Sequence, residues 1–307
     1  MRFSITNLML MVVAIALLLL VLYEPGIDDA PVAPAKLFSL SASEVNEISI
    51  HNGGQPLIIL KRESAMAWQM VEPITVAANG YKVASVLNIL DEQPTNRFTV
   101  DAAKFTRYGL SKPQVRLRLK GAGGEQELNF GSQTPLNRYR YLQLDNEVVT
   151  IKDSAFYPVA SLYTNFITSR LIPDGEQITS IQLSNFRLKF VDGVWKLESK
   201  KEGEALEDRL SADQLAAWID GWRYARSVDI EAITRDVTES EKQEMVTITL
   251  KSGAELHWTI ASKGDDGGLI LERPDLGIEY HMSDAQRTAL LLPPHSEPVE
   301  QEQEVNR

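Results

Sequence analysis

The sequence predicts an α+β protein: an N-terminal transmembrane helix followed by two tandem units, each a curved antiparallel sheet packed on an amphipathic helix. Three observations support this fold class. The chain opens with an uncharged apolar stretch of helix length, short segments of alternating apolar and polar residues recur between turns, and the pattern of the first half returns about 131 residues later. A chain of 307 residues is long enough for two domains with separate cores.

Residues 1–23 are predicted to form the transmembrane anchor. Residues 3–23 carry no charge and, at about 1.5 Å per residue in a helix, match the thickness of one bilayer core. The alternative is a cleavable signal peptide, although no small-x-small cleavage site follows closely. The flanking charges place the N-terminus in the cytoplasm and the bulk of the chain in the periplasm of a Gram-negative cell (Arg2 before the span; Glu24, Asp28 and Asp29 after it). We therefore expect a single-pass protein of the inner membrane.

A proline-rich tether, residues 24–36, leads into the first α+β unit, residues 37–173. Short strands there precede an amphipathic helix at 83–90, whose apolar residues recur at i, i+3, i+4 and i+7. A meander of antiparallel strands follows over residues 107–151, introduced by a turn at Gly109. Pro158 then predicts the first turn of a further helix with one apolar face (Val159, Leu162, Tyr163, Phe166 and Ile167).

The second α+β unit, residues 174–294, repeats this order. Asp192-Gly193 predicts a hairpin, and Ser211 with Gln214 predicts a capping box at the start of its helix. The helix stripe returns 132 residues later and the first meander strand 131 residues later (Val83, Val86, Leu87 and Leu90 onto Leu215, Trp218, Ile219 and Trp222; Val115, Leu117 and Leu119 onto Val246, Ile248 and Leu250). The agreement predicts an internal duplication. An acidic tail, residues 295–307, is predicted to be disordered.

Short motifs in the first unit resemble the domain-of-unknown-function 4340 family. They are Trp68 with Pro73 after it, Tyr108-Gly109-Leu110-Ser111 with Pro113, Phe130-Gly131 ahead of Thr134-Pro135, and Tyr141 in the next strand. The resemblance covers residues 40–170, and the second unit is similar to a divergent copy without the Tyr-Gly-Leu turn. It implies an anchored extracytoplasmic α+β repeat protein, from a family often associated with gliding-type ABC transporter components. It implies no catalytic residues.

Four arginines are the candidate partner-binding residues: Arg116, Arg118, Arg138 and Arg140. Alternation along the strands predicts that they contribute to one basic sheet face. The formal net charge of the chain is −11, so such a face would orient an acidic partner, and nucleic acid is not expected as a partner. A solvated face without any ligand is the competing interpretation, and it remains open.

Other candidate sites have little support in the sequence. The absence of cysteine removes disulfides, thiolate catalysis and thiol-based metal sites. His257 and His281 could meet on neighbouring strands and bind a metal, but no third ligand stands at a diagnostic spacing. The glycine-rich segment 121–124 precedes a strand, which indicates a hairpin and not a phosphate-binding loop. We predict no catalytic, cofactor or metal site.

Two function classes remain. The first is a non-enzymatic accessory or scaffold component of a transporter or envelope complex, whose partner is an ABC transporter permease or another envelope protein. The second is an envelope-glycan-binding protein or hydrolase that uses a cleft between the two units. A pocket with a buried carboxylate pair, or with a histidine among polar neighbours, would favour the second class.

Overall fold

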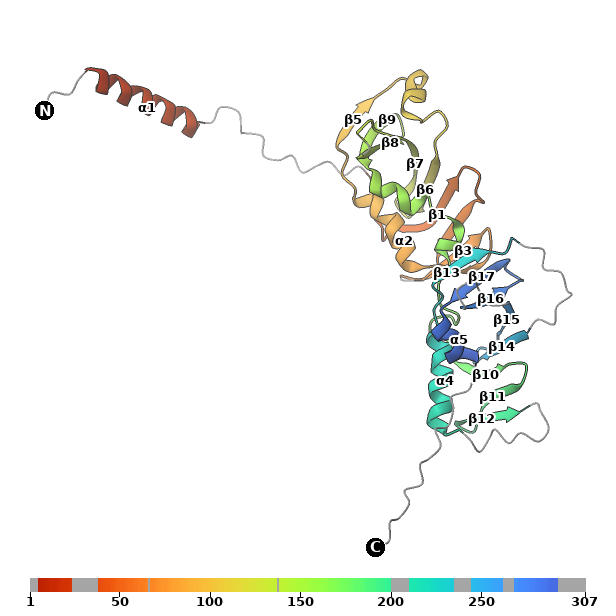
Figure 1. The fold of residues 1–307 in the computed structure, drawn as a ribbon. Coiled ribbons are helices and arrows are strands. Elements are labelled where there is room, and N and C mark those ends of the chain that lie inside the picture. The colour runs from red at the N-terminus through yellow and green to blue at the C-terminus, as the bar shows by residue number, and fades with distance from the viewer. Residues whose placement is uncertain are drawn as a thin grey trace, which may run out of the picture. The chain divides into compact units, whose positions relative to one another are not determined.

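The computed structural model describes residues 5–23, 38–65, 67–136, 138–199, 210–234, 244–261 and 268–291. The chain divides into two compact units, Met1–Ser39 and Leu40–Arg307. The first contains helix α1 (Ile5–Tyr23) (Figure 1). Within the described parts of the chain, no helix is both long enough and apolar enough to cross a membrane. The predicted tether and acidic tail lie outside the described residues.

Nine antiparallel strands form the first sheet, in the order β4-β3-β2-β1-β6-β7-β8-β9-β5 (Figure 1). They are β1 (Val45–Asn52), β2 (Ile58–Arg62), β3 (Trp68–Glu72), β4 (Val76–Ala77), β5 (Asn96–Thr99), β6 (Val115–Gly121), β7 (Gly124–Gln133), β8 (Tyr139–Leu144) and β9 (Glu147–Lys152). The predicted meander is confirmed as β6 to β9. Strand β1 pairs with β6, so β1 to β4, which precede the meander in the chain, continue the sheet on the β6 side of the meander.

Eight antiparallel strands form the second sheet, in the order β12-β11-β10-β14-β15-β16-β17-β13. They are β10 (Ile178–Gln182), β11 (Phe186–Val191), β12 (Val194–Ser199), β13 (Asp229–Ala232), β14 (Glu244–Leu250), β15 (Glu255–Ala261), β16 (Leu269–Arg273) and β17 (Ile278–Met282). With β10–β12 in the places of β1–β3, β14–β17 in those of β6–β9 and β13 in that of β5, the two orders match except that β4 has no counterpart in the second sheet. A common strand order is what internal duplication predicts.

The alternation predicted for the first meander strand decides which face of the sheet is the core. Val115, Leu117 and Leu119 of β6 are fully buried, while Arg116 and Arg118 between them are exposed. The apolar positions predicted to correspond on β14 are buried as well (Val246, Ile248 and Leu250). Each sheet therefore has one face in a hydrophobic core and an opposite face with polar positions.

Helix α2 (Gly80–Leu87) carries the first predicted apolar stripe, and its residues are buried as far as the helix extends. The chain then tightens into the 3-10 turn η1 (Asn88–Asp91). A 3-10 helix has three residues per turn, so Ile89, three residues after Val86, takes the core position. Leu90, predicted as the last residue of the stripe, is only partly buried.

Helix α4 (Ala212–Tyr224) carries the second predicted stripe, and all four of its residues are buried. The capping box predicted from Ser211 and Gln214 is present, with each side chain bonded to the backbone of the other residue. Two tryptophans then attach α4 to α5 (Asp284–Leu291). The indole N–H groups of Trp218 and Trp222 donate to the carbonyl oxygen of Leu290 at 3.2 and 3.0 Å.

The predicted helix over residues 158–167 is wrong. The structure has two short helical turns instead, α3 (Phe156–Val159) and η4 (Tyr163–Phe166). Ile167 forms a β-bridge with Ala78, and the backbone N–H of Asn79 donates to the carbonyl oxygen of Phe166 at 2.7 Å. The backbone is extended at Leu162 (φ −66°, ψ 154°), which separates the two turns, and again at Ile167 (φ −81°, ψ 142°), where this pairing follows the second turn.

Candidate functional site

The structure separates the four arginines of the predicted basic face. Arg116 and Arg118 are exposed on β6, and Arg138 is exposed just before β8. Arg140 is only 5% exposed, so its predicted placement on a solvent-facing surface is wrong. Alternation along β8 puts Arg140 on the same side as the buried Leu142, which faces the core.

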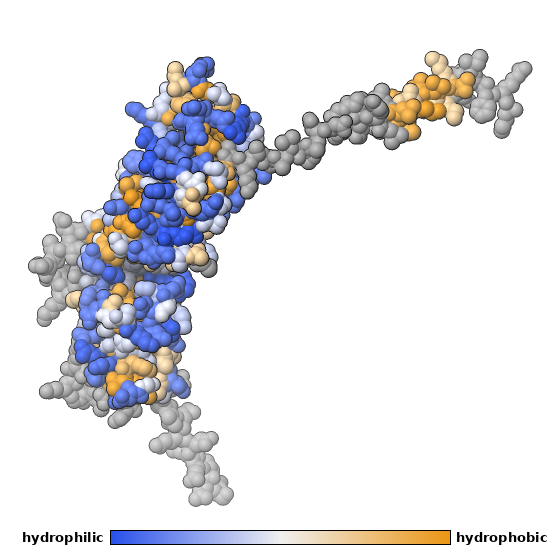
Figure 2. Space-filling view, turned by 180° about the vertical axis from the view of Figure 1, so that it is seen from behind, coloured by the Kyte–Doolittle hydropathy of each residue, from blue (hydrophilic) through white to orange (hydrophobic). Residues whose placement is uncertain are grey.

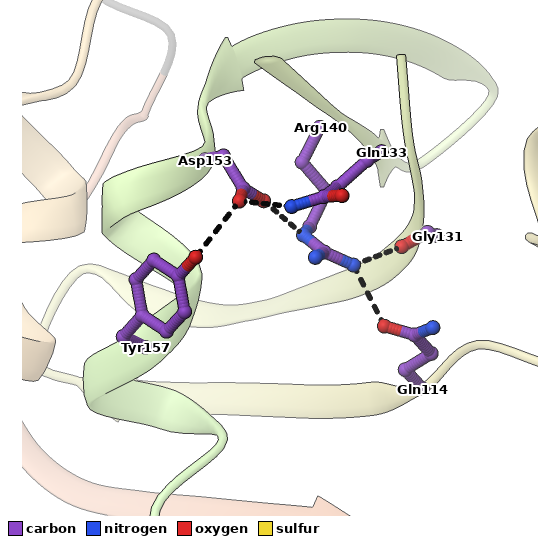
Figure 3. Close-up of polar contacts among 6 residues, drawn as sticks. All are labelled: Gln114, Gly131, Gln133, Arg140, Asp153 and Tyr157. Carbon is purple, nitrogen blue, oxygen red and sulfur yellow. Dashed lines mark hydrogen bonds and ion pairs between the residues drawn. The ribbon is translucent and has the colours of Figure 1, made fainter. Parts of the chain in front are cut away.

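Arg140 lies at the centre of a buried hydrogen-bonded cluster (Figure 3). Its Nε donates to Oδ1 of Asp153 at 2.7 Å, and its Nη1 donates to Oε1 of Gln114 and to the carbonyl oxygen of Gly131, both at 2.7 Å. The guanidinium carbon lies 3.6 Å from the centroid of the Phe156 ring. The positive charge of Arg140 is thus stabilised by the carboxylate of Asp153 and by the face of the Phe156 ring.

Asp153 begins the short turn η3 (Asp153–Ala155) and is 6% exposed. Its second carboxylate oxygen, Oδ2, accepts hydrogen bonds from Nε2 of Gln133 and, at 3.3 Å, from the hydroxyl of Tyr157 (Figure 3). Its backbone N–H donates to the carbonyl oxygen of Arg138 at 3.1 Å. Both carboxylate oxygens have partners, which offsets the cost of removing the charge from water.

Two glycines of the family-like motifs allow the backbone to close around this Arg140–Asp153 cluster. The turn η2 (Ala102–Tyr108) ends at Gly109, whose φ of +70° is the left-handed conformation that favours glycine. A Cβ at Gly109 would stand 2.3 Å from Oγ of Ser132, and a Cβ at Gly131 would stand 2.2 Å from the carbonyl oxygen of Tyr108. The turn therefore contacts β7 at a distance that only glycine permits.

The β7–β8 pairing is irregular at the same place. Its register shifts between Phe130 and Gln133, where three steps along β7 oppose two along β8, so β7 has one extra residue there. A bulge of this kind redirects backbone groups, and here the carbonyl oxygen of Gly131 meets Arg140. Next to the bulge, the ring of Tyr108 packs edge-on against Tyr141, with centroids 4.8 Å apart. Tyr108, Gly109, Gly131 and Tyr141, four of the motif residues, thus lie in one packed region.

The chemistry of this cluster is structural. The Arg140 charge is neutralised by a carboxylate, and both groups are buried, so neither faces a substrate. The cluster instead joins β7, β8 and η3. No pattern in the sequence singles out four of its other members (Gln114, Gln133, Asp153 and Tyr157). A usable signal for Arg140 itself was available, because alternation counted back from Leu142 and Leu144 places Arg140 on the core side.

The exposed arginines of β6 lie on a strip of mixed charge. Nε of Arg118 is 3.0 Å from a carboxylate oxygen of Glu125, and Nη2 donates to Glu127 at 2.9 Å. This hydrogen bond from Arg118 lowers the pKa of the Glu127 carboxyl. Arg116, two residues away on the same face, also favours the ionised form of Glu127. Hydrophilic residues predominate on the face of the folded part shown in Figure 2.

A half-buried lysine connects α2 to the segment after α3. Nζ of Lys82 donates to Oγ of Ser161 at 2.6 Å and lies 5.7 Å from the centroid of the Phe166 ring. Burial lowers the pKa of the Lys82 ammonium group. The Ser161 hydroxyl donates in turn to the carbonyl oxygen of Tyr157, whose own hydroxyl reaches Asp153. These contacts support the Arg140–Asp153 cluster from the helix side.

A second polar cluster lies on the second sheet, where the sequence analysis predicted no site. Glu231 of β13 is directly opposite Glu279 of β17, and His281 follows two residues later. His257 and His281, which the sequence would have allowed on neighbouring strands, do not meet, because β16 separates their strands. His257 instead lies beside Glu255 on its own strand, at 3.7 Å.

Residues 68–257 match the family described as "Domain of unknown function (DUF4340)". The match begins at Trp68 and continues through the first sheet into β15 of the second, so it extends beyond the residues that carry the resemblance in the first unit. No curated protein and no solved structure matches the chain. Since the match covers more than half of the 307 residues, the chain belongs to the family of domain of unknown function 4340.

Proposed function

We propose that the protein is a non-enzymatic accessory or scaffold component of a transporter or envelope complex, anchored in the inner membrane with its two sheets in the periplasm. The observation that supports a non-enzymatic role is the closed Arg140–Asp153 cluster. Arg140 and Asp153 are buried there and satisfy each other beside Gly131 of the family-like motifs, and such networks rigidify a fold. A rigid sheet with a polar outer face suits binding to another protein.

The membrane part of this proposal rests on the uncharged apolar stretch at residues 3–23. We expect the full-length protein to sediment with membranes and to resist extraction by salt and carbonate, because the apolar side chains would be held in the bilayer. Alkaline phosphatase fused after Leu291 should be active, since that enzyme requires an oxidising compartment. Recovery of a soluble, N-terminally shortened protein would indicate a cleaved signal peptide instead.

The contact surface we propose for an acidic membrane partner, such as an ABC transporter permease, is the exposed pair Arg116 and Arg118. Changing both to serine should reduce co-purification of that partner at least tenfold, because opposite charges orient and speed docking. The thermal midpoint should change little, since exposed ion pairs contribute little to stability. Arg140 is left unchanged, because its substitution would disturb the core.

The matched control for this experiment changes two exposed lysines of the second sheet, Lys189 and Lys196, to serine. They face each other across β11 and β12, so the same number of positive charges is removed from a different surface. The lysine variant should retain the partner. Retention of the partner by the arginine variant, or equal loss in both variants, would contradict a contact at β6.

A glycan hydrolase is the second candidate, and one observation favours it. Glu272 and Glu279, directly opposite each other on β16 and β17, are both buried carboxylates, and glycosidases use a pair of which one member is desolvated. However, Glu272 is 1% exposed, so it cannot reach a sugar in this conformation. Release of soluble fragments from purified peptidoglycan, lost in Glu279→Gln, would favour the hydrolase over the accessory role.

A further inference from the structure

Glu231, Glu279 and His281 bring together the ligand types of a metal centre on the second sheet. Imidazole nitrogen and carboxylate oxygen are the donors that zinc and related first-row divalent cations take in proteins. A carboxylate oxygen from each glutamate and a ring nitrogen of the histidine all lie within 4.8 Å of one another. We propose that these three residues, the β13–β17 cluster, bind a divalent cation of the zinc class.

The strand register positions the three ligands without any loop. Glu279 and His281 are two residues apart on β17, so both side chains leave the same face of the sheet. Glu231 is directly opposite Glu279 on β13, and paired residues have Cβ atoms about 4.5–5.5 Å apart. Ligands held on paired strands are positioned more accurately than ligands on loops.

The distances suit a tetrahedral ion. Nε2 of His281 is 3.2 Å from Oε1 of Glu279. Two ligands bonded at about 2.0–2.1 Å to a tetrahedral zinc are themselves about 3.3 Å apart, so these two atoms already have the required separation. Glu279 is 8% exposed and therefore fixed by packing, whereas Glu231 is exposed and can complete the site by a rotamer change. Three protein ligands leave a fourth position for water or a partner group.

The charges on neighbouring strands give a second argument. Glu279 is directly opposite Glu231 on one side and Glu272 on the other, so three carboxylates form a row across β16, β17 and β13. A divalent cation bound between Glu231 and Glu279 would lie beside this row of carboxylates and be attracted by its negative charge. The equivalent edge of the first sheet has opposite charges instead, since Arg97 of β5 donates to Glu147 of β9.

Titration calorimetry with zinc chloride tests the site. The experiment uses the full-length chain in detergent, purified without a polyhistidine tag. We expect one equivalent to bind with micromolar or tighter affinity, and we expect Glu231→Gln and His281→Gln each to weaken binding at least tenfold. His257→Gln is the matched control, because His257 likewise lies beside a glutamate on its own strand of this sheet, although it is more exposed than His281. This variant should bind zinc as the unchanged protein does.

Three results would overturn the proposal. They are no zinc binding by the unchanged protein, undiminished binding by Glu231→Gln, and an equal loss of affinity in His257→Gln. Circular dichroism of each variant shows whether it is folded. Glu231→Gln alone decides the outcome if His281→Gln does not fold, since Glu231 is exposed and its substitution should leave the sheet intact.

Discussion

An Asp153→Ala variant should lose roughly 3–5 kcal/mol of its free energy of unfolding. The substitution removes the carboxylate that lies 2.7 Å from Nε of Arg140 and leaves a buried guanidinium without its counter-charge. It also removes the acceptor for Gln133 and Tyr157. Denaturant unfolding followed by circular dichroism measures the loss as a shift of the midpoint.

The second substitution, Arg140→Leu, separates charge from packing. The residue 131 positions later, Leu271, is fully buried on β16, so leucine is compatible with the corresponding strand. We expect Arg140→Leu/Asp153→Ala to be more stable than Asp153→Ala alone, because replacing a whole buried ion pair by apolar groups is often nearly neutral. A double variant no more stable than the single one would mean that uncompensated charge is not the cause of the loss.

A single methyl group at position 131 should also destabilise the protein, by about 3 kcal/mol. In Gly131→Ala the new Cβ would stand 2.2 Å from the carbonyl oxygen of Tyr108 and 2.9 Å from Cδ2 of Leu110. Either the turn or the β7 bulge must move, and the carbonyl oxygen that accepts from Arg140 moves with it. The thermal midpoint of unfolding, compared with that of the unchanged protein, measures this effect.

Gly53→Ala is the matched control for the glycine variant. A Cβ at Gly53 has no atom within 4 Å, and its backbone is not left-handed, so the same change should be tolerated there. Similar losses of stability in both variants would contradict the close contact as the cause, because removing the flexibility of glycine from the unfolded chain stabilises a protein and cannot produce a loss. A loss confined to Gly131→Ala supports the close contact between turn and strand.

Features that depend on a few neighbouring residues could be predicted from the sequence. The alternation along β6 is sufficient to identify its buried face. The Asp192-Gly193 hairpin has φ angles of +53° and +85°, which short polar residues and glycine adopt most readily. The capping box at Ser211 likewise needs only residues within one helical turn. Local chemistry determines each of these elements.

Features that depend on distant residues could not be predicted in this way. The helix predicted at 158–167 breaks at Leu162 and ends at Phe166, where Ile167 pairs with Ala78, far away in the chain. Alternation along β8 is sufficient to predict that the Arg140 side chain faces the core. No local pattern, however, shows that the bulge at Gly131 supplies a carbonyl acceptor for it. The β13–β17 cluster could not be predicted for the same reason. The two-residue spacing of Glu279 and His281 puts them on one face of a strand, but only the order of the strands in the sheet brings Glu231 beside them.

The pairing of β1 with β6, and of β10 with β14, has a consequence for how the chain folds as it is synthesised. In each pair the first partner forms a local meander with the strands that follow it, and the second partner is made only after a helix and several turns. The exposed edge of β1 must therefore stay unpaired until residue 121 is available. Non-local pairing of this kind is slow, and open edges invite wrong partners. Joining β1 to β6 is thus the step that commits the first sheet to its native strand order, and the second sheet repeats that step at β10 and β14.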